Sequence, residues 1–115
     1  MTRAAQEILE AHLQALAKAD VAAVLEDYRE DAVLLTLDGA LRGREAIGEF
    51  FTGAFAALPD AVWDLTAASY TDDAVLFRWT ATSPLGRVRN GVDTVVVSDG
   101  AIQLQTASFD LEPRG

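Results

Sequence analysis

Gly91-Val92-Asp93-Thr94-Val95-Val96-Val97-Ser98-Asp99-Gly100-Ala101-Ile102 is the stretch that decides the fold. It predicts a long strand, a tight Asp-Gly turn and the start of a returning strand. Because side chains alternate along a strand, Asp93, Val95 and Val97 share one face, and the opposite face carries Thr94 and further valines. Both faces are apolar, so we expect a central strand of the sheet that is covered on both sides.

Asp93 is the best chemical lead in the sequence, because it places a carboxylate in this apolar strand. If its face lines a concave pocket, burial disfavours the charged form and raises the pKa of Asp93. A carboxyl group of that kind suits general acid–base catalysis or hydrogen bonding to a ligand. The alternative is a structural ion pair with a nearby cation, for which Arg89 on the same predicted strand face is the candidate.

The composition fits one domain that spans residues 1–115. Half of the residues are hydrophobic (50%), so the chain can bury a core of its own. It has no cysteine, which excludes disulfides, thiolate nucleophiles and thiolate metal sites, and its only histidine is His12. Because imidazole-rich metal sites need more than one histidine, we expect neither a metal nor another cofactor.

The charge balance limits the partners that the chain can bind. With 18 acidic against 9 basic residues, the formal net charge is -9, which disfavours nucleic acids and anionic membranes. No apolar run approaches the ~20 residues that span a membrane, and the N-terminus lacks the apolar core of a signal peptide. We therefore expect a cytoplasmic protein that binds neither nucleic acid nor membrane.

Apolar residues at helical or strand spacing, separated by turn residues, predict the order of the elements. Three helices are expected over residues 2–18, 21–28 and 44–57. Thr2 and Asp20 are the predicted N-caps of the first two helices. Besides the opening strand, strands are expected over residues 32–37, 41–42, 62–70, 74–82 and 101–110. Residues 29–31 are predicted to form a polar turn, and residues 111–115 a frayed tail.

This order of elements predicts an α+β domain in which helices pack on one face of a curved sheet. A curved sheet with helices across its mouth forms a cone, and the closed end of a cone is a natural small-molecule pocket. Phe77 and Trp79 share one face of the strand 74–82, and we expect them in the pocket wall together with Trp63 and Phe51. Core packing is the alternative for each of these aromatic residues.

The chain resembles the NTF2-like superfamily, and within it the SnoaL-like branch, which is named for a polyketide cyclase. The motifs that carry the resemblance are Ala15-Leu16-Ala17-Lys18-Ala19-Asp20-Val21, Tyr28-Arg29-Glu30-Asp31-Ala32-Val33, Gly43-Arg44-Glu45-Ala46-Ile47, Leu58-Pro59-Asp60, Arg78-Trp79-Thr80-Ala81-Thr82, and Gly91-Val92-Asp93 with Asp99-Gly100-Ala101-Ile102. The resemblance implies a cystatin-like cone in which three N-terminal helices pack on a curved antiparallel or mixed sheet. It also implies a two-fold homodimer through the outer face of the sheet.

The resemblance to ketosteroid isomerases suggests roles for four polar residues. Asp93 matches the position of a protonated aspartic acid, His12 that of a tyrosine, and Thr36 that of the aspartate base. Tyr28 matches an accessory pocket tyrosine of some members. Threonine cannot remove a proton from carbon unaided, so the resemblance disfavours steroid isomerisation. In the polyketide cyclases, an aspartate on the same late strand acts as acid and base, and Asp93 is similar to it in position.

Three hypotheses for the function follow from these observations. In the first, a cyclase- or isomerase-like enzyme without a cofactor uses Asp93 for proton transfer, assisted by His12 and Tyr28. In the second, the apolar pocket binds a small hydrophobic ligand without turnover, and His12 is a structural residue. Tyr28 and Thr36 would supply hydroxyl contacts to a ligand or pack in the core. In the third, the chain is an assembly subunit that lends its sheet face to a larger complex.

Overall fold

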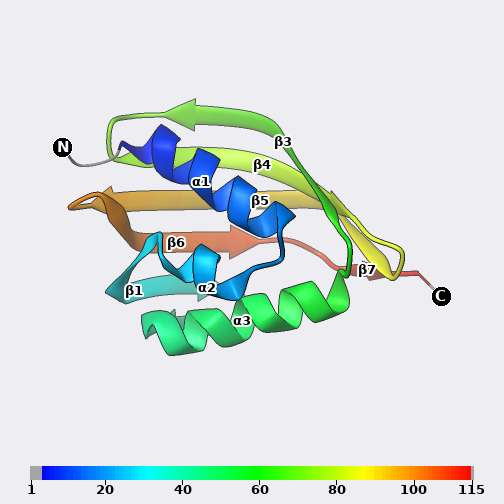
Figure 1. Cartoon of the computed structure of the whole chain (residues 1–115). Coiled ribbons are helices and arrows are strands. Elements are labelled where there is room, and N and C mark those ends of the chain that lie inside the picture. Colours follow the sequence, from blue (N-terminus) through cyan, green and yellow to red (C-terminus); the bar gives the residue numbers. More distant parts are fainter. Residues whose placement is uncertain (1–3, 115) are drawn as a thin grey trace.

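A mixed sheet curves around three helices in the computed structural model, which describes residues 4–114 (Figure 1). The helices are α1 (Ala5–Ala17), α2 (Val21–Leu25) and α3 (Gly43–Ala57). The strands are β1 (Tyr28–Thr36), β2 (Gly39–Arg42), β3 (Val62–Tyr70), β4 (Ala74–Thr82), β5 (Gly86–Ser98), β6 (Ala101–Ser108) and β7 (Glu112–Pro113). Their order is β2-β1-β6-β5-β4-β3, with β7 beside β5, and β1 and β6 are the one parallel pair among the described strands. The predicted α+β class is confirmed.

The three helices lie on the same side of the sheet (Figure 1). Asp20 caps α2 as predicted, because its carboxylate accepts a hydrogen bond from the amide of Ala23 at 3.1 Å. α1 begins after Ala4, whose amide donates to the Glu7 carboxylate at 3.3 Å, and the predicted cap Thr2 lies outside the described residues. Within residues 4–114, no helix is both long enough and apolar enough to cross a membrane.

β1 begins earlier than the sequence predicts. Residues up to 28 were expected in the second helix and residues 29–31 in a turn, but α2 ends at Leu25 and Tyr28 already pairs with Ile102 of β6. The ladder to β6 shifts register between Tyr28 and Val33, so this part of β1 bulges away from its neighbour. The bulge allows the polar residues 29–31 to belong to a strand. The alternation of apolar residues in the sequence does not reveal this bulge.

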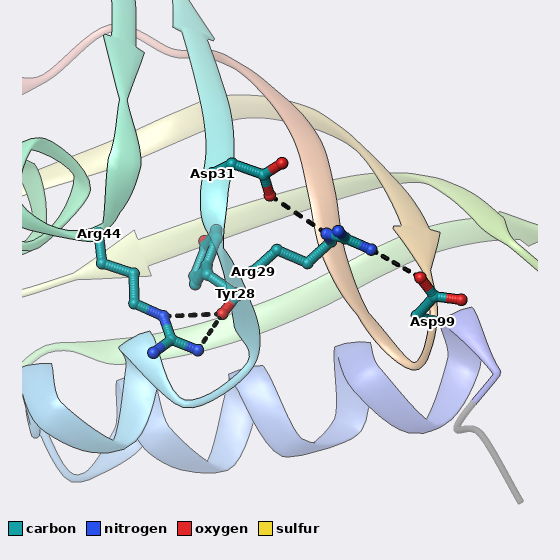
Figure 2. Close-up of polar contacts among 5 residues, drawn as sticks. All are labelled: Tyr28, Arg29, Asp31, Arg44 and Asp99. Atoms are coloured by element: carbon teal, nitrogen blue, oxygen red, sulfur yellow. Dashed lines mark hydrogen bonds and ion pairs between the residues drawn. The ribbon is translucent and has the colours of Figure 1, made fainter.

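Two arginines hold the bulged start of β1, as Figure 2 shows. Arg44, near the start of α3, donates two hydrogen bonds to the carbonyl of Tyr28, from Nε at 2.9 Å and from Nη2 at 2.5 Å. Arg29 forms ion pairs with Asp31 at 3.2 Å and with Asp99 of the β5–β6 turn at 2.8 Å. The ion pairs of Arg29 are exposed and contribute little stability. Arg44 has the larger effect on the core, because its hydrogen bonds fix the backbone of Tyr28, whose side chain is buried.

A bulge in β5 decides which of its side chains face the helices. Between the pairs Trp79–Gly91 and Ala81–Val88, β5 carries one more residue than β4. The alternation of β5 therefore reverses at this point, and Val88 and Gly91 are both buried. Arg89, which simple alternation places on the inner face, lies exposed on the outside.

The predicted frayed tail forms a short strand instead. Glu112 and Pro113 make up β7, which pairs with the start of β5. The carboxylate of Glu112 accepts hydrogen bonds from Nε and Nη2 of Arg89 at 2.7 and 2.8 Å. The interpretation of Arg89 as an ion-pair partner of Asp93 is therefore wrong, because the bulge turns Arg89 toward β7 and away from the inner face.

The core lies between the inner face of the sheet and the helices. Its fully buried side chains include Ile8 of α1, Ile47 of α3 and Val95 of β5. β5 is central in the sheet, as predicted, with β4 and β6 as its neighbours. Only the inner face of the sheet is covered within the described part of the chain, because on the outer face Leu76 of β4 is 53% exposed and Val92 of β5 is 38% exposed. The expectation that β5 is covered on both sides is therefore wrong for residues 4–114.

Candidate active site

A small cavity lies between the inner face of the sheet and helices α1 and α3. It encloses about 50 Å³, which is room for a few water molecules. Most of its wall is apolar, and the polar side chains that reach it belong to His12, Trp79, Asp93 and Gln105. The remaining lining residues are Leu13, Leu16, Phe50, Phe51, Ala54, Leu58, Trp63, Phe77, Ala107 and Phe109.

Asp93 projects from the middle of β5 toward the helices and is 6% exposed. Nε1 of Trp79 donates a hydrogen bond to its Oδ1 at 2.8 Å, and Nε2 of Gln105 donates to its Oδ2 at 2.8 Å. Both donors are neutral, and within residues 4–114 no cation forms an ion pair with Asp93. The same residues contain no group of three or more His, Asp or Glu side chains that could hold a metal ion. Asp93 is thus a buried carboxyl group without a compensating positive charge.

Burial controls the titration of Asp93. Desolvation raises its pKa from 3.8 to about 6, and the hydrogen bonds from Trp79 and Gln105 lower the pKa by a smaller amount. At pH 7 the carboxylate form predominates, and at pH 6 the acid and the carboxylate are present in similar amounts. A carboxyl group with this pKa can accept a proton and return it near neutral pH.

Trp79 reaches Asp93 because its neighbour on β5 has no side chain. Gly91 pairs with Trp79, and a Cβ atom placed on Gly91 would lie 2.2 Å from the indole ring. The ring therefore packs directly on the backbone of Gly91. On its other sides it contacts Trp63 and Phe109, with ring centroids 5.7 and 5.5 Å away. This packing fixes the direction in which Nε1 points.

Gln105 links Asp93 to Tyr28. It is 2% exposed, and its Oε1 accepts a hydrogen bond from the hydroxyl of Tyr28 at 2.5 Å, while its Nε2 donates to Asp93. Burial, and to a lesser extent the nearby carboxylates of Asp93 and Asp27, raise the pKa of Tyr28 well above its usual range. Tyr28 therefore stays protonated and serves as the donor that orients the amide of Gln105.

Gln105 is a site residue that strand alternation alone does not reveal. β6 carries one extra residue between Ile102 and Leu104 relative to β5, which reverses its alternation. β6 holds two glutamines, Gln103 and Gln105, and only the position of this bulge decides which of them faces Asp93. The sequence signal for Gln105 is a polar residue in the strand predicted to pair with the strand that carries Asp93.

His12 lies on α1 at the cavity wall and is 3% exposed. Its ring packs edge-to-face on Phe51 and on Tyr28, with ring centroids 5.6 and 6.0 Å away. Burial lowers the pKa of His12 from 6.5 to about 4, so the imidazole is neutral at pH 7. Its Nδ1 is buried and has no hydrogen-bond partner within residues 4–114. A polar group of a bound ligand would satisfy this nitrogen if it reached Nδ1.

The structure brings together most of the site residues that the sequence suggests. The predicted residues that line the cavity are His12, Phe51, Trp63, Phe77, Trp79 and Asp93. Tyr28 lies behind the wall and reaches the cavity through Gln105. The structure corrects the assignment of Thr36 to the pocket. Its position at the end of β1 places its hydroxyl in the β1–β2 turn, where it donates to the carbonyl of Gly39 and accepts from the amide of Asp38.

Solved structures share this fold. A protein of unknown function with a cystatin-like fold from Methylobium petroleophilum has a TM-score of 0.75 and 19% identity, over 94% of this chain and 82% of its own. A proposed polyketide cyclase from Sinorhizobium meliloti has a TM-score of 0.76 and 20% identity, over 88% of this chain and 93% of its own. A proposed ketosteroid isomerase from Kribbella flavida has a TM-score of 0.77 and 17% identity, over 96% of this chain and 82% of its own. At these identities the likeness shows the cystatin-like, NTF2-like fold.

Comparison with the curated proteins gave no match. The SnoaL-like domain model, in contrast, matches residues 9–105. That span covers most of the chain and contains His12, Trp79, Asp93 and Gln105. The resemblance seen in the sequence motifs is confirmed, and the chain belongs to the SnoaL-like domain family.

Proposed function

We propose that the cavity receives the polar end of a small, mostly apolar molecule and that Asp93 transfers a proton on it. The observation that carries this proposal is the buried carboxyl group of Asp93. Two neutral donors form hydrogen bonds to it, and no cation among the described residues forms an ion pair with it. A structural carboxylate in the interior is normally stabilised by a cation, and a solvated carboxylate keeps its ordinary pKa. Asp93 fits neither description.

Removal and return of a proton at a carbon next to a carbonyl group is the chemistry that suits this carboxyl group. The carboxylate of Asp93 takes the proton, which leaves an enolate, and the resulting acid returns it to another carbon or to oxygen. Each carboxylate oxygen accepts one hydrogen bond from the protein, so each retains capacity toward the cavity. Proton transfer by a positioned group contributes about 10²- to 10⁴-fold to the rate, which suits cyclisation and isomerisation without a cofactor.

His12 supplies the second polar contact to the ligand. With its hydrogen on Nδ1, the neutral imidazole can donate to the carbonyl oxygen on which negative charge develops. Gln105 holds Asp93, and Tyr28 holds Gln105, so both act as positioning residues. The surrounding aromatic wall keeps water away from the reacting atoms and strengthens these contacts.

Ligand binding without turnover is the second candidate function. One observation favours it: Asp93 is the only carboxyl group among the described residues that line the cavity. Efficient removal of a proton from carbon benefits from a second acid or base, and Thr36 lies outside the cavity. Binding needs only the apolar wall and a polar anchor.

Hydrogen–deuterium exchange at carbon separates the two functions. The α-protons of the enolisable ketones cyclopentanone and 2-tetralone exchange for deuterium in D2O at the rate at which a base removes them from carbon. We expect the protein to accelerate their exchange, measured by loss of proton NMR signal. Asp93→Asn should abolish the acceleration, and Asp64→Asn, which removes an exposed carboxylate of β3, should retain it. Exchange at the buffer rate with either ketone bound would establish binding without turnover.

We also propose a homodimer through the outer face of the sheet. Leu76 and Val92 leave large apolar surfaces exposed there, and no described part of the chain covers them. Exposed apolar patches of this kind mark interaction surfaces. Two-fold pairing of the same face would cover the patch on both chains at once.

A further inference from the structure

An apolar groove adjoins the cavity. It encloses about 260 Å³ beside α3, next to the segment that follows β6. The side chains that line both the groove and the cavity are Phe50, Ala54, Leu58 and Phe109. The groove alone is lined by Gly53, Ala57 and Leu111. The two spaces are therefore neighbours, with the shared side chains between them.

The volumes show that the cavity cannot hold a ligand of ordinary size by itself. Small-molecule sites usually measure about 300 to 1,000 Å³. The cavity offers about 50 Å³ and contains the polar groups, whereas the groove offers about 260 Å³ and has no ionisable side chain among its described lining residues. Together they reach the lower end of the usual range, and the polar groups lie at the inner end of the combined space.

We infer that the ligand is elongated, with its polar end at Asp93 and His12 and an unbranched apolar tail that runs into the groove. The position of the polar end rests on the proposed function. The path of the tail lies between Phe50 and Phe109, whose rings pack edge-to-face with centroids 6.2 Å apart and close this path until the ring of Phe109 moves. The ligand class that fits is a ketone, enol or phenol with an unbranched alkyl tail.

Phe109 is the side chain that admits the tail. It follows the end of β6, so its backbone is outside the regular ladder of the sheet. The next residue is held firmly, because Asp110 exchanges two hydrogen bonds with Asn90, at 2.9 and 3.0 Å. The backbone can therefore stay in place while the ring of Phe109 changes rotamer and opens the cavity to the groove.

Gly53 sets how much of the groove is open. A Cβ atom placed on Gly53 meets no other atom within 4 Å, so the space above it is empty. A larger side chain at this position of α3 would enter the groove without a clash against the backbone. Gly53 is thus the position at which the length of the ligand tail can be tested with little effect on the fold.

Calorimetric titration with 4-methylphenol, 4-butylphenol and 4-hexylphenol tests the inference without requiring turnover. Each methylene that enters the groove should tighten binding about fourfold, so that 4-butylphenol binds about 60-fold tighter than 4-methylphenol. Gly53→Leu should remove most of this gain and leave the affinity for 4-methylphenol unchanged. Ala56→Leu places the same side chain on an exposed position of α3 outside the groove and should behave as wild type. Leu111→Ser, which makes another lining residue of the groove polar, should reduce the gain in part.

The outcomes separate this inference from the proposed function. If Gly53→Leu and Leu111→Ser both keep the full gain with tail length, the tail does not lie in the groove and the inference is overturned. In that case binding of 4-methylphenol that weakens in Asp93→Asn still supports the proposed position of the polar end. If none of the three phenols binds the wild-type protein, the proposed function falls and the inference falls with it.

Discussion

Asp93→Asn tests the cost of burying an uncompensated charge, because asparagine has nearly the same shape and cannot ionise. Burial raises the pKa of Asp93 from 3.8 to about 6 in the folded chain, whereas the unfolded chain keeps the ordinary value. The folded state therefore binds this proton more tightly than the unfolded state. The stability contributed by the acid form is complete below pH 3.8 and is lost as the pH rises through about 6. At 1.36 kcal/mol per pKa unit, the loss is about 3 kcal/mol at neutral pH.

His12 has the opposite dependence on pH. Burial lowers its pKa to about 4, so between pH 6.5 and pH 4 the unfolded chain binds the proton and stability falls as the pH falls. The two groups offset each other in the stability of the wild-type protein. The variant Asp93→Asn retains His12. The contribution of His12 therefore cancels when the free energy of unfolding of the wild type is subtracted from that of the variant.

We expect the free energy of unfolding of Asp93→Asn, relative to wild type, to rise by about 2 to 3 kcal/mol between pH 4 and pH 7. Urea unfolding followed by circular dichroism at steps of one pH unit measures it. Asp64→Asn, on the exposed face of β3, is the control and should show a difference that changes little with pH. A difference between Asp93→Asn and wild type that is constant with pH, or that changes in the opposite direction, would refute the burial of an unpaired charge.

Three further substitutions test the supports of the site and its partner surface. Gly91→Ala should destabilise the protein by about 1 to 3 kcal/mol, because its Cβ would displace Trp79, whereas Gly53→Ala should be neutral or stabilising in urea unfolding. Tyr28→Phe should cost about 1 to 3 kcal/mol by leaving Oε1 of Gln105 without its donor; thermal and urea unfolding equal to wild type would argue against this link. Leu76→Lys should convert a dimer into monomers in sedimentation velocity, and a monomeric wild type would exclude the proposed interface.

The parts of the fold that local patterns determine could be predicted from the sequence. The strands Val62–Tyr70 and Ala74–Thr82 agree with the expected bounds, because β-prone runs there end in clear turn residues. Asp20 caps α2 because a capping carboxylate acts within one turn of helix. The inward direction of Asp93 also followed from local alternation, since β5 itself carries no extra residue between Asp93 and the apolar residues Val95 and Val97.

The features that the sequence could not predict depend on bulges and on pairing between distant segments. The bulge in β5 turns Arg89 outward, and the bulge in β6 turns Gln105 inward, so alternation places both residues on the wrong face. Each bulge adds one residue without a distinctive sequence signal. The C-terminal segment forms β7, which pairs with β5 and places Glu112 against Arg89. No sequence pattern within residues 111–114 predicts this contact.

The pKa of Asp93 in the ligand-free protein is the most direct test of whether its carboxyl group is desolvated and unpaired. The carboxyl carbon of Asp93 can be followed by NMR through a pH titration and assigned by its absence in Asp93→Asn. We expect a pKa of about 6, the value of a desolvated carboxyl group that accepts hydrogen bonds from Trp79 and Gln105. A pKa at or below 3.8 would contradict it, because Asp93 would then be a solvated or ion-paired carboxylate and no longer a candidate for proton transfer.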